Sequence, residues 1–307
     1  MKIPAFVLAF WLALTAAATA QVSVEVVLDQ EHFLPGETMN VAVRIINRSG
    51  QTLQLGADPD WLTFAVESKD GYVILKNGDV PVVQPFTLES SKRATKHVDL
   101  APYFNLTKEG AYTVSATVNI KEWNRQFTSQ ARMFEIIRAA SLRDIEVGVP
   151  RPAGSTNSEP QLRKYSLLQA NYLRKTLVLY VQITDGAGKL KRVFPIGPMI
   201  SFGQPEPQID KDSNLHILYQ SGPRLFRYFI ITPDGEVIGR QTYEFTNRPR
   251  LKVGENSQIS VEGGRRRITD EDIPSPDAAD AAGTNSPALP ATNAAPASAP
   301  PPAPAVK

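Results

Sequence analysis

The arginines late in the chain are the residues whose type and spacing best suit contact with a ligand. Arg248 and Arg250 are followed by the consecutive residues Arg265, Arg266 and Arg267. The guanidinium group is planar and carries a fork of N–H donors that matches the oxygens of a carboxylate or a phosphate. We therefore predict that these five arginines bind an anionic partner.

The excess of positive charge in the chain lies around these arginines. Residues 21–138 carry 12 Lys and Arg against 14 Asp and Glu, and residues 139–267 carry 19 against 12. Residues 268–307 carry 1 against 5, so an acidic end follows the basic region. A basic surface attracts acidic partners. Two alternatives stay open: ordinary surface charge, and shielding of the arginine run by the acidic residues Asp270–Asp272.

The segment Asp210–Asn214, D-K-D-S-N, resembles the start of a calcium-binding loop, in which alternate positions supply oxygen ligands. The rest of that pattern is missing, because Leu215 replaces the sharp-turn glycine and Ser221 replaces the bidentate glutamate. Asp, Ser and Asn also stabilise tight turns through bonds to nearby backbone. We therefore predict a hairpin turn here and no metal site.

A second pair of carboxylates, Asp58 and Asp60, lies beside Trp61 and has the composition of a sugar site. Pro59 between them instead favours a loop whose tryptophan packs on the core, since most aromatic side chains in strand-rich regions are buried.

The three histidines lack the spacing of a metal or catalytic centre. His32 precedes a turn, His97 lies in a polar strand, and His216 is expected on the polar face of an alternating strand. The nucleophile elbow, the zinc-protease helix, the phosphate loop and the dinucleotide glycine pattern are all absent from the sequence. We therefore predict a protein that is not an enzyme and that needs no cofactor.

The first twenty residues predict export. Lys2 is followed by the apolar run Ile3–Leu14 and by the small residues Ala18-Thr19-Ala20, which is the pattern of a cleaved signal peptide. The mature chain is expected to begin near Gln21, in the periplasm or outside the cell. No later apolar run reaches the length of a transmembrane helix.

The chain has no cysteine, so exported domains must be stabilised by burial rather than by disulfides. After the signal peptide, residues 1–20, we expect two domains of ordinary size, residues 21–138 and residues 139–273. Residues 274–307 are rich in Pro and Ala with few large apolar side chains, which predicts a disordered tail.

Short strands dominate the pattern of the first domain. Val22–Leu28, Met39–Ile45 and Leu62–Val66 each alternate apolar with polar residues. Lys69-Asp70-Gly71 predicts a tight turn, after which Tyr72–Leu75 is expected to return as the paired strand. Several short strands separated by turns indicate a β-sandwich and an all-β fold.

Tyr112 follows a glycine turn and lies two residues before the strand position Val114. This arrangement resembles the tyrosine corner of immunoglobulin-like sandwiches, where the hydroxyl bonds back to upstream backbone. With the turns Leu34–Glu37 and Asn47–Gly50, residues 22–137 resemble a bacterial immunoglobulin-like module. The order of strands and turns is similar to that of the BsuPI-type proteinase-inhibitor domain family. The resemblance implies an immunoglobulin-like fold, and it introduces protease inhibition as an alternative function.

The second domain contains an internal repeat with an offset of 48 residues. Five residue types recur in the same order: Leu177, Tyr180, Ile183, Thr184 and Arg192 return as Leu225, Tyr228, Ile231, Thr232 and Arg240. Each unit has the pattern strand, turn, strand. A third strand is expected to follow each unit, at Leu215–Tyr219 and at Ile259–Val261.

Repeats of this length with several strands resemble the blades of a β-propeller over residues 177–262. Only two units are visible, although Ile145–Val149 and Tyr165–Leu173 have the pattern of an earlier, degenerate unit. A closed ring needs at least four blades. We therefore expect the repeats to form a small sandwich or meander, with association with another chain as the alternative.

These observations predict an exported, non-catalytic binding or envelope-associated protein. Its second domain is expected to recognise an anionic envelope glycan, a lipid headgroup or an acidic protein, and not nucleic acid. The alternative is a protease-inhibitor-like module that acts through an exposed loop of the first domain.

Overall fold

The computed structural model describes residues 21–149, 161–172, 176–254 and 257–274. Within these ranges the chain forms 21 β-strands and two short 3-10 turns, and none of it is α-helical. The all-β prediction is therefore confirmed. The predicted signal peptide and nearly all of the predicted tail lie outside the described residues.

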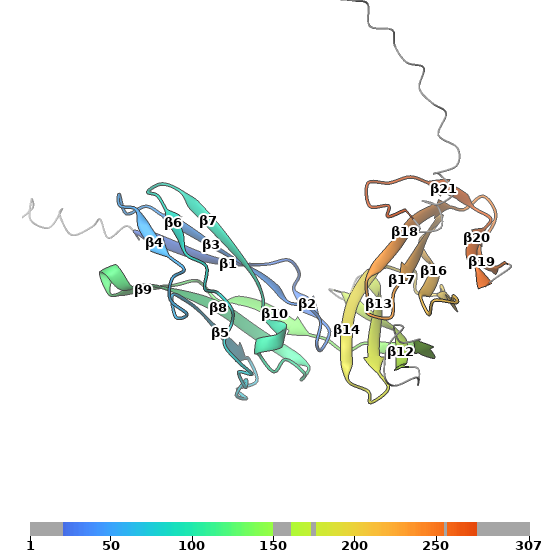
Figure 1. Ribbon diagram of the computed structural model, residues 1–307, viewed down its shortest axis with the longest axis horizontal. Helices are drawn as coiled ribbons and strands as arrows, with labels where there is room; N and C mark the ends of the chain where they lie inside the picture. Colours follow the sequence, from blue (N-terminus) through green and yellow to red (C-terminus); the bar gives the residue numbers. More distant parts are fainter. Residues whose placement is uncertain (1–20, 150–160, 173–175, 255–256, 275–307) are drawn as a thin grey trace, which may run out of the picture.

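Two strand-rich units follow each other along the chain and lie side by side (Figure 1). The first unit is built from two sheets that share one core. Sheet I has the order β1 (Val22–Leu28), β3 (Asn40–Asn47) and β7 (Arg93–Asp99). Sheet II has the order β2 (His32–Phe33), β10 (Arg132–Ile136), β8 (Gly110–Ile120) and β5 (Leu62–Ser68), with β9 (Arg125–Thr128) paired to β8. A small pair, β4 (Leu53–Leu55) and β6 (Phe86–Leu88), and the 3-10 turns η2 (Ala101–Tyr103) and η3 (Lys121–Trp123) complete the unit.

The alternating pattern of the sequence explains how these strands are buried. In β3, Val41, Val43 and Ile45 are fully buried, whereas the residues between them are half-buried. Neighbouring strands in both sheets run antiparallel, except that β2 pairs in parallel with β10. Apolar side chains from both sheets therefore meet in one layer, which is the burial that a chain without disulfides requires.

The hairpin predicted after β5 is wrong. The residues 72–75 form no strand, and β5 pairs only with β8, where Ser68 lies opposite Tyr112. The chain instead leaves the sheet as an extended loop, in which Val73 is 84% exposed and Leu75 is 63% exposed. The apolar residues of this segment do not alternate, so nothing in the pattern assigns them to a buried face.

Tyr112 makes the backbone contact that its position predicted. Its ring is fully buried beside Phe134, and its hydroxyl donates to the carbonyl of Lys108 at 2.5 Å. Because the Tyr112 proton is used in that bond, the Tyr72 hydroxyl is the donor in the contact between the two tyrosines. The bond from Tyr112 to Lys108 holds the loop before β8 against the core, and Tyr72 packs beside it.

The second unit also consists of two main sheets. Sheet III is a meander of β11 (Ala140–Val149), β12 (Gln161–Tyr172), β13 (Thr176–Asp185) and β14 (Leu190–Pro198). Sheet IV has the order β15 (Glu206–Ile209), β16 (Leu215–Gly222), β17 (Leu225–Ile231), β18 (Val237–Glu244) and β21 (Arg265–Arg267). A separate hairpin is formed by β19 (Arg250–Val253) and β20 (Ile259–Glu262).

The third strand of each repeat precedes the repeated pair rather than following it. The segment expected to follow the first repeat is β16, and it pairs with β17 of the second repeat. The strand that precedes the first repeated pair is β12, which pairs with β13. The expected strand at Ile259–Val261 lies in β20 and pairs with β19 instead of joining either repeat. Antiparallel neighbours joined by short turns pair most readily, and this decides the order.

Equivalent residues of the two repeats lie on equivalent faces of their sheets. Ile183 and Ile231 both lie in the core shared by sheets III and IV. Tyr180 and Tyr228, also equivalent, lie on the outer faces of their sheets. The two sheets therefore pack through the same face of each repeat, and each sheet leaves an outer face that other residues must cover.

The first unit covers part of the outer face of sheet III. Leu34, in the turn after β2, is buried against Ala170, Tyr180 and Val193. Gly36 in the same turn has a φ of +77°, a conformation that side chains rarely adopt, and a Cβ there would meet the side chain of Leu190. Glycine therefore suits this close approach of the two units.

Glu37 holds the same turn in place from inside the first unit. Its buried carboxylate accepts hydrogen bonds from the Leu34 backbone N–H at 2.7 Å and from Gln30 Nε2 at 2.6 Å. Burial penalises the charged form and raises the pKa of Glu37 to about 7, although both hydrogen bonds act in the opposite direction.

We predict that the first unit becomes less stable as the pH rises from about 4.5 to about 7. The raised pKa means that the folded state holds the Glu37 proton more tightly than the unfolded state, whose pKa is near 4.5. The stabilisation by the protonated Glu37 is therefore fully present below pH 4.5 and is lost as the pH rises through the pKa of the folded state, about 7. It corresponds to about 3 kcal/mol over the interval.

Urea unfolding followed by tryptophan fluorescence tests this, because Trp61 and Trp123 both lie in the first unit. Glu37→Gln should remove the pH dependence, whereas Glu67→Gln, at an exposed position of β5, should retain it. If the free energy of unfolding of Glu37→Gln depended on pH as that of the wild type does, the attribution of this dependence to Glu37 would be wrong.

Candidate functional site

The five predicted arginines lie on two chain segments that meet beside the β19–β20 hairpin but extend toward opposite edges of sheet IV, because β21 pairs with β18 whereas Arg248 approaches Glu206 of β15. Arg265, Arg266 and Arg267 form β21, which pairs with β18. Arg248 and Arg250 lie just beyond β18, where the β19–β20 hairpin begins. We call these five residues the arginine surface.

Two glycines bring the segments of the arginine surface together. Gly263 and Gly264 have φ values of +86° and +68°, which side chains rarely adopt. The Gly264 backbone N–H donates to Asn247 Oδ1 at 2.8 Å, beside Arg248.

Most of the arginine surface is engaged in ion pairs within the chain. Glu244 of β18 pairs with both Arg265 and Arg267, and this holds the pKa of Glu244 below its usual value. Arg266 pairs with Asp272 at 2.7 Å, so the predicted shielding by the following acidic residues occurs at this position.

Arg248 lies 3.8 Å from Glu206, whereas Arg250 has no ion pair within the described part of the chain. Such pairs at the surface contribute about 0–1 kcal/mol each, so they leave the guanidinium groups available to a ligand. The side chain of Arg265 is 72% exposed.

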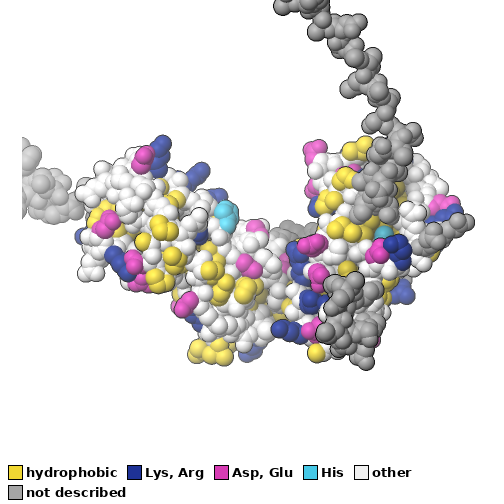
Figure 2. Space-filling model, viewed as in Figure 1, with side chains coloured by type: hydrophobic (Ala, Val, Ile, Leu, Met, Phe, Trp, Pro, Cys, Tyr) yellow, Lys and Arg dark blue, Asp and Glu magenta, His cyan; other side chains and the backbone are white. Residues whose placement is uncertain are grey.

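Cations remain in excess on this surface after the ion pairs are formed. Seven cationic side chains lie on these two segments and on the residues next to them: Arg224, Arg248, Arg250, Lys252, Arg265, Arg266 and Arg267. Within the described residues they form ion pairs with four carboxylates: Glu206, Glu244, Glu262 and Asp272. Figure 2 shows the two signs of charge side by side on the visible face of the second unit.

A groove beside β21 contains arginines that the sequence prediction did not select. The groove has a volume of about 450 Å³ and is lined by Arg227 of β17, Thr242 of β18 and Arg267. Glu271 enters it and pairs with Arg227 at 3.3 Å and with Arg240 at 3.7 Å. The signal in the sequence was the repeat itself, in which Arg240 is equivalent to Arg192.

Other basic residues of the repeats hold the two sheets together. Lys191 and Arg163 both approach Asp234, in the turn between β17 and β18, at 3.3 Å and 3.9 Å. Arg192 donates to the carbonyl of Gly235 in the same turn at 2.8 Å. These cations of sheet III fasten a turn of sheet IV, so they are already in use within the fold.

The segment compared with a calcium loop is a turn between β15 and β16. The carboxylate of Asp210 accepts hydrogen bonds from the backbone N–H groups of Asp212 and Asn214, from Asn214 Nδ2 and from His216 Nε2. Together these bonds hold the pKa of Asp210 below its usual value, although burial acts in the opposite direction. The predicted hairpin turn is confirmed, and its carboxylate is fully occupied.

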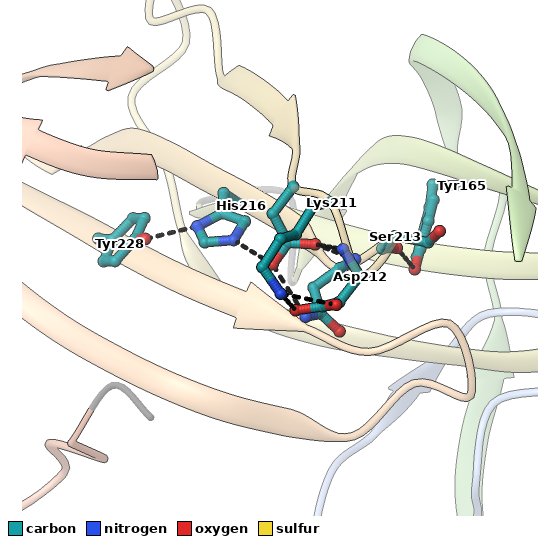
Figure 3. A network of polar contacts seen from close by, with 8 residues as sticks. Tyr165, Lys211, Asp212, Ser213, His216 and Tyr228 are labelled. Carbon is teal, nitrogen blue, oxygen red and sulfur yellow. Dashed lines mark hydrogen bonds and ion pairs between the residues drawn. The ribbon is translucent and has the colours of Figure 1, made fainter. Parts of the chain in front are cut away.

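His216 is fully buried, so the expectation that it lies on a polar face is wrong. Its Nδ1 lies 2.5 Å from the Tyr228 hydroxyl and its Nε2 lies 3.1 Å from Asp210 (Figure 3). With Asp210 ionised and the imidazole neutral, Nε2 donates to the carboxylate and Nδ1 accepts from Tyr228. The side chains of β16 alternate between the two faces of sheet IV. Because apolar residues cover both faces, His216 is buried as well.

The turn between β15 and β16 also forms hydrogen bonds to sheet III. Tyr165 of β12 donates to the Ser213 carbonyl at 2.8 Å, and the Ser213 hydroxyl donates to the Gly148 carbonyl of β11 at 3.2 Å. Figure 3 shows Ser213 between Tyr165 and the residues around His216.

The carboxylates beside Trp61 are also occupied. Asp58 and Asp60 both pair with Lys121, at 3.0 Å and 3.2 Å. Trp61 is buried and its indole N–H donates to the carbonyl of Val82. The preferred interpretation, a loop whose tryptophan packs on the core, is confirmed.

No set of three or more His, Cys, Asp or Glu side chains in the described ranges has the arrangement of a metal site. Within those same ranges, no helix is long and apolar enough to cross a membrane. Comparisons with protein-family models, with curated proteins and with solved structures each gave no match.

We predict that Asp210→Ala lowers the free energy of unfolding by about 3 kcal/mol, because it leaves the buried His216 N–H and the turn N–H groups without an acceptor. Since the pKa of Asp210 is lowered on folding, its contribution is present above pH 3.8 and is lost as the pH falls further.

The matched control is Asp212→Ala in the same turn, whose exposed carboxylate pairs only with Lys211 among the described residues. It should change stability by less than about 0.5 kcal/mol. Urea unfolding followed by circular dichroism measures both, and equal losses from the two variants would refute the role of Asp210.

Proposed function

We propose that this protein is an exported, non-catalytic binding protein that recognises an anionic partner through the arginine surface of its second unit. The supporting observation is the placement of Arg248, Arg250 and β21 on adjacent segments with more cations than carboxylates. An anionic envelope glycan, a lipid headgroup or an acidic protein each offers the carboxylates or phosphates that arginine forks bind.

Export is proposed on the signal-peptide pattern of residues 1–20. Outside the cytoplasm these three anions are the polyanions at hand, and for that reason nucleic acid is not proposed. The non-catalytic role is supported by the ionisable groups of the candidate clusters, since the carboxylates of Asp58, Asp60 and Asp210 and the ring of His216 are all used within the fold.

For the first unit we propose an immunoglobulin-like sandwich. In that fold strands A, B and E share one sheet, and strands C, F and G share the other. The orders β1-β3-β7 and β5-β8-β10 correspond to these two sets. The bond from Tyr112 to Lys108 corresponds to the tyrosine corner.

We predict that replacing Arg248, Arg250, Arg265, Arg266 and Arg267 by Ala weakens binding of the chain to purified cell envelope about 10-fold or more. Five exposed charge contacts of about 0.5 kcal/mol each produce an effect of this size. The salt dependence of binding should flatten as well, because screening acts on the charges that are removed. Co-sedimentation at increasing salt concentration measures both.

The control removes the same number of charges from the first unit. Arg48, Lys69, Lys92, Arg93 and Arg125 are exposed there and form no ion pair with any other described residue. Their replacement by Ala should leave binding within about 2-fold of wild type. Equal weakening in both variants would reduce the effect to net charge and would overturn the arginine surface as the site.

A second candidate function is supported by the loop between β5 and β6. Its apolar residues Val73, Leu75 and Val83 are exposed, and its backbone is anchored where Asn105 N–H donates to the Leu75 carbonyl. An exposed, anchored loop is the form in which protease-inhibitor-like modules present residues to a protease. A panel of secreted proteases tests this: inhibition by wild type that Leu75→Asp abolishes would favour this function over the first.

A further inference from the structure

The acidic segment Thr269–Ile273 lies on the cationic groove beside β21 and occupies it as an anionic ligand would. Glu271 places its carboxylate between Arg227 and Arg240. Asp272 pairs with Arg266.

The backbone of this segment also pairs with the sheet. The N–H of Ile273 donates to the Arg240 carbonyl, and the Arg240 N–H donates to the Ile273 carbonyl, each at 3.0 Å. The segment thus combines strand pairing to β18 with carboxylates on arginines. This is how an extended peptide binds a sheet edge, with backbone bonds for affinity and side-chain contacts for specificity.

The arginines under the segment lie on the face of sheet IV that forms the core. Phe229 is in the core, and Arg240 lies directly opposite it in the β17–β18 pairing. Arg227 lies two residues before Phe229 on the same face and opposite Tyr219, which is also in the core. Cations in this position need an anion nearby, and Glu271 supplies it.

The segment is held more weakly than the strand before it. β21 pairs with β18 through three consecutive residues, whereas the segment returns to β18 by a single bridge at Ile273. Ile268, which joins the two, is 85% exposed, and the side chain of Glu271 is 59% exposed. The side chain of Asp272 is only 10% exposed, so Ile268 and Glu271 are the part of the segment that opens most readily.

We propose that Thr269–Ile273 is an internal stand-in for an acidic extended peptide of a partner protein, which displaces it and pairs with β18 over Arg227 and Arg240. The inference rests on the proposed function and selects the acidic protein among its three classes of partner. The occupant of the groove is itself a peptide, and it uses backbone bonds that a glycan or a lipid headgroup does not supply. The segment Thr269–Ile273 therefore competes with the partner peptide for the groove.

The test uses the full chain and a labelled synthetic peptide with the sequence of residues 268–274, I-T-D-E-D-I-P, in fluorescence anisotropy at physiological salt. Glu271→Ala weakens the internal competitor and should bind the peptide about 3- to 10-fold more tightly than wild type, the equivalent of two surface ion pairs. The neutral peptide I-T-N-Q-N-I-P should not bind.

The matched control is Asp212→Ala, which removes the same charge from the second unit outside the groove and outside the arginine surface, where Asp212 pairs with Lys211. Equal gains in Glu271→Ala and Asp212→Ala would overturn the proposal, because they would reflect net charge alone. Adding Arg227→Gln to Glu271→Ala should abolish the gain, and a gain that persists would also overturn it.

Two further probes separate this proposal from the proposed function. If Glu271→Ala gains affinity for anionic phospholipid vesicles or an acidic polysaccharide but not for the peptide, the occupant is not a peptide and the inference fails. If the wild type binds the vesicles or the polysaccharide in a salt-dependent way, and Glu271→Ala binds no probe more tightly than the wild type does, the inference fails while the proposed function stands. If neither protein binds any anionic probe, both fail.

Discussion

The face-to-face packing of sheets III and IV is the constraint on which the second unit depends. The chain has no cysteine, so the side chains that β12, β13, β16 and β17 bury between the sheets must hold the unit together. Both repeats contribute the same face to this layer, as Ile183 and Ile231 illustrate. Each sheet then has a second apolar face to cover. The β19–β20 hairpin covers that of sheet IV, and Leu34 of the first unit covers part of that of sheet III.

The same packing determines where the cations lie. At the margin of this layer, the inward-facing positions of β17 and β18 hold Arg227, opposite Tyr219, and Arg240, opposite Phe229. At the opposite end, Lys191 and Arg192 reach across to the turn at Asp234 and Gly235. The basic residues of the second unit thus form two groups. One group links sheet III to a turn of sheet IV, and the other lies at the margin of the core beside the acidic segment Thr269–Ile273.

The sequence predicted strands well and strand partners poorly. Alternation located β1, β3 and β5, and the repeat located β13 and β17, because period-2 burial is a local property. Partners depend on distant contacts. Tyr72–Leu75 was expected to pair and does not, and β16 was assigned to the wrong repeat. At the candidate site, the arginine run was evident, but its main partner Glu244 comes from a strand about twenty residues earlier. His216 was misplaced because its strand is covered on both faces.

The contact of Leu34 with sheet III has a mechanical consequence for the whole molecule. The units are joined through residues 137–139 of the chain, and the turn at Leu34–Glu37 packs on Ala170 and Tyr180 directly beside this link, where Ile137 and Ala139 belong to the same apolar cluster. A covalent link alone permits rotation about its backbone bonds, whereas apolar contacts around the link restrict that rotation. The orientation of the second unit relative to the first therefore depends on this packing, and on the glycine and the buried carboxylate that shape the turn.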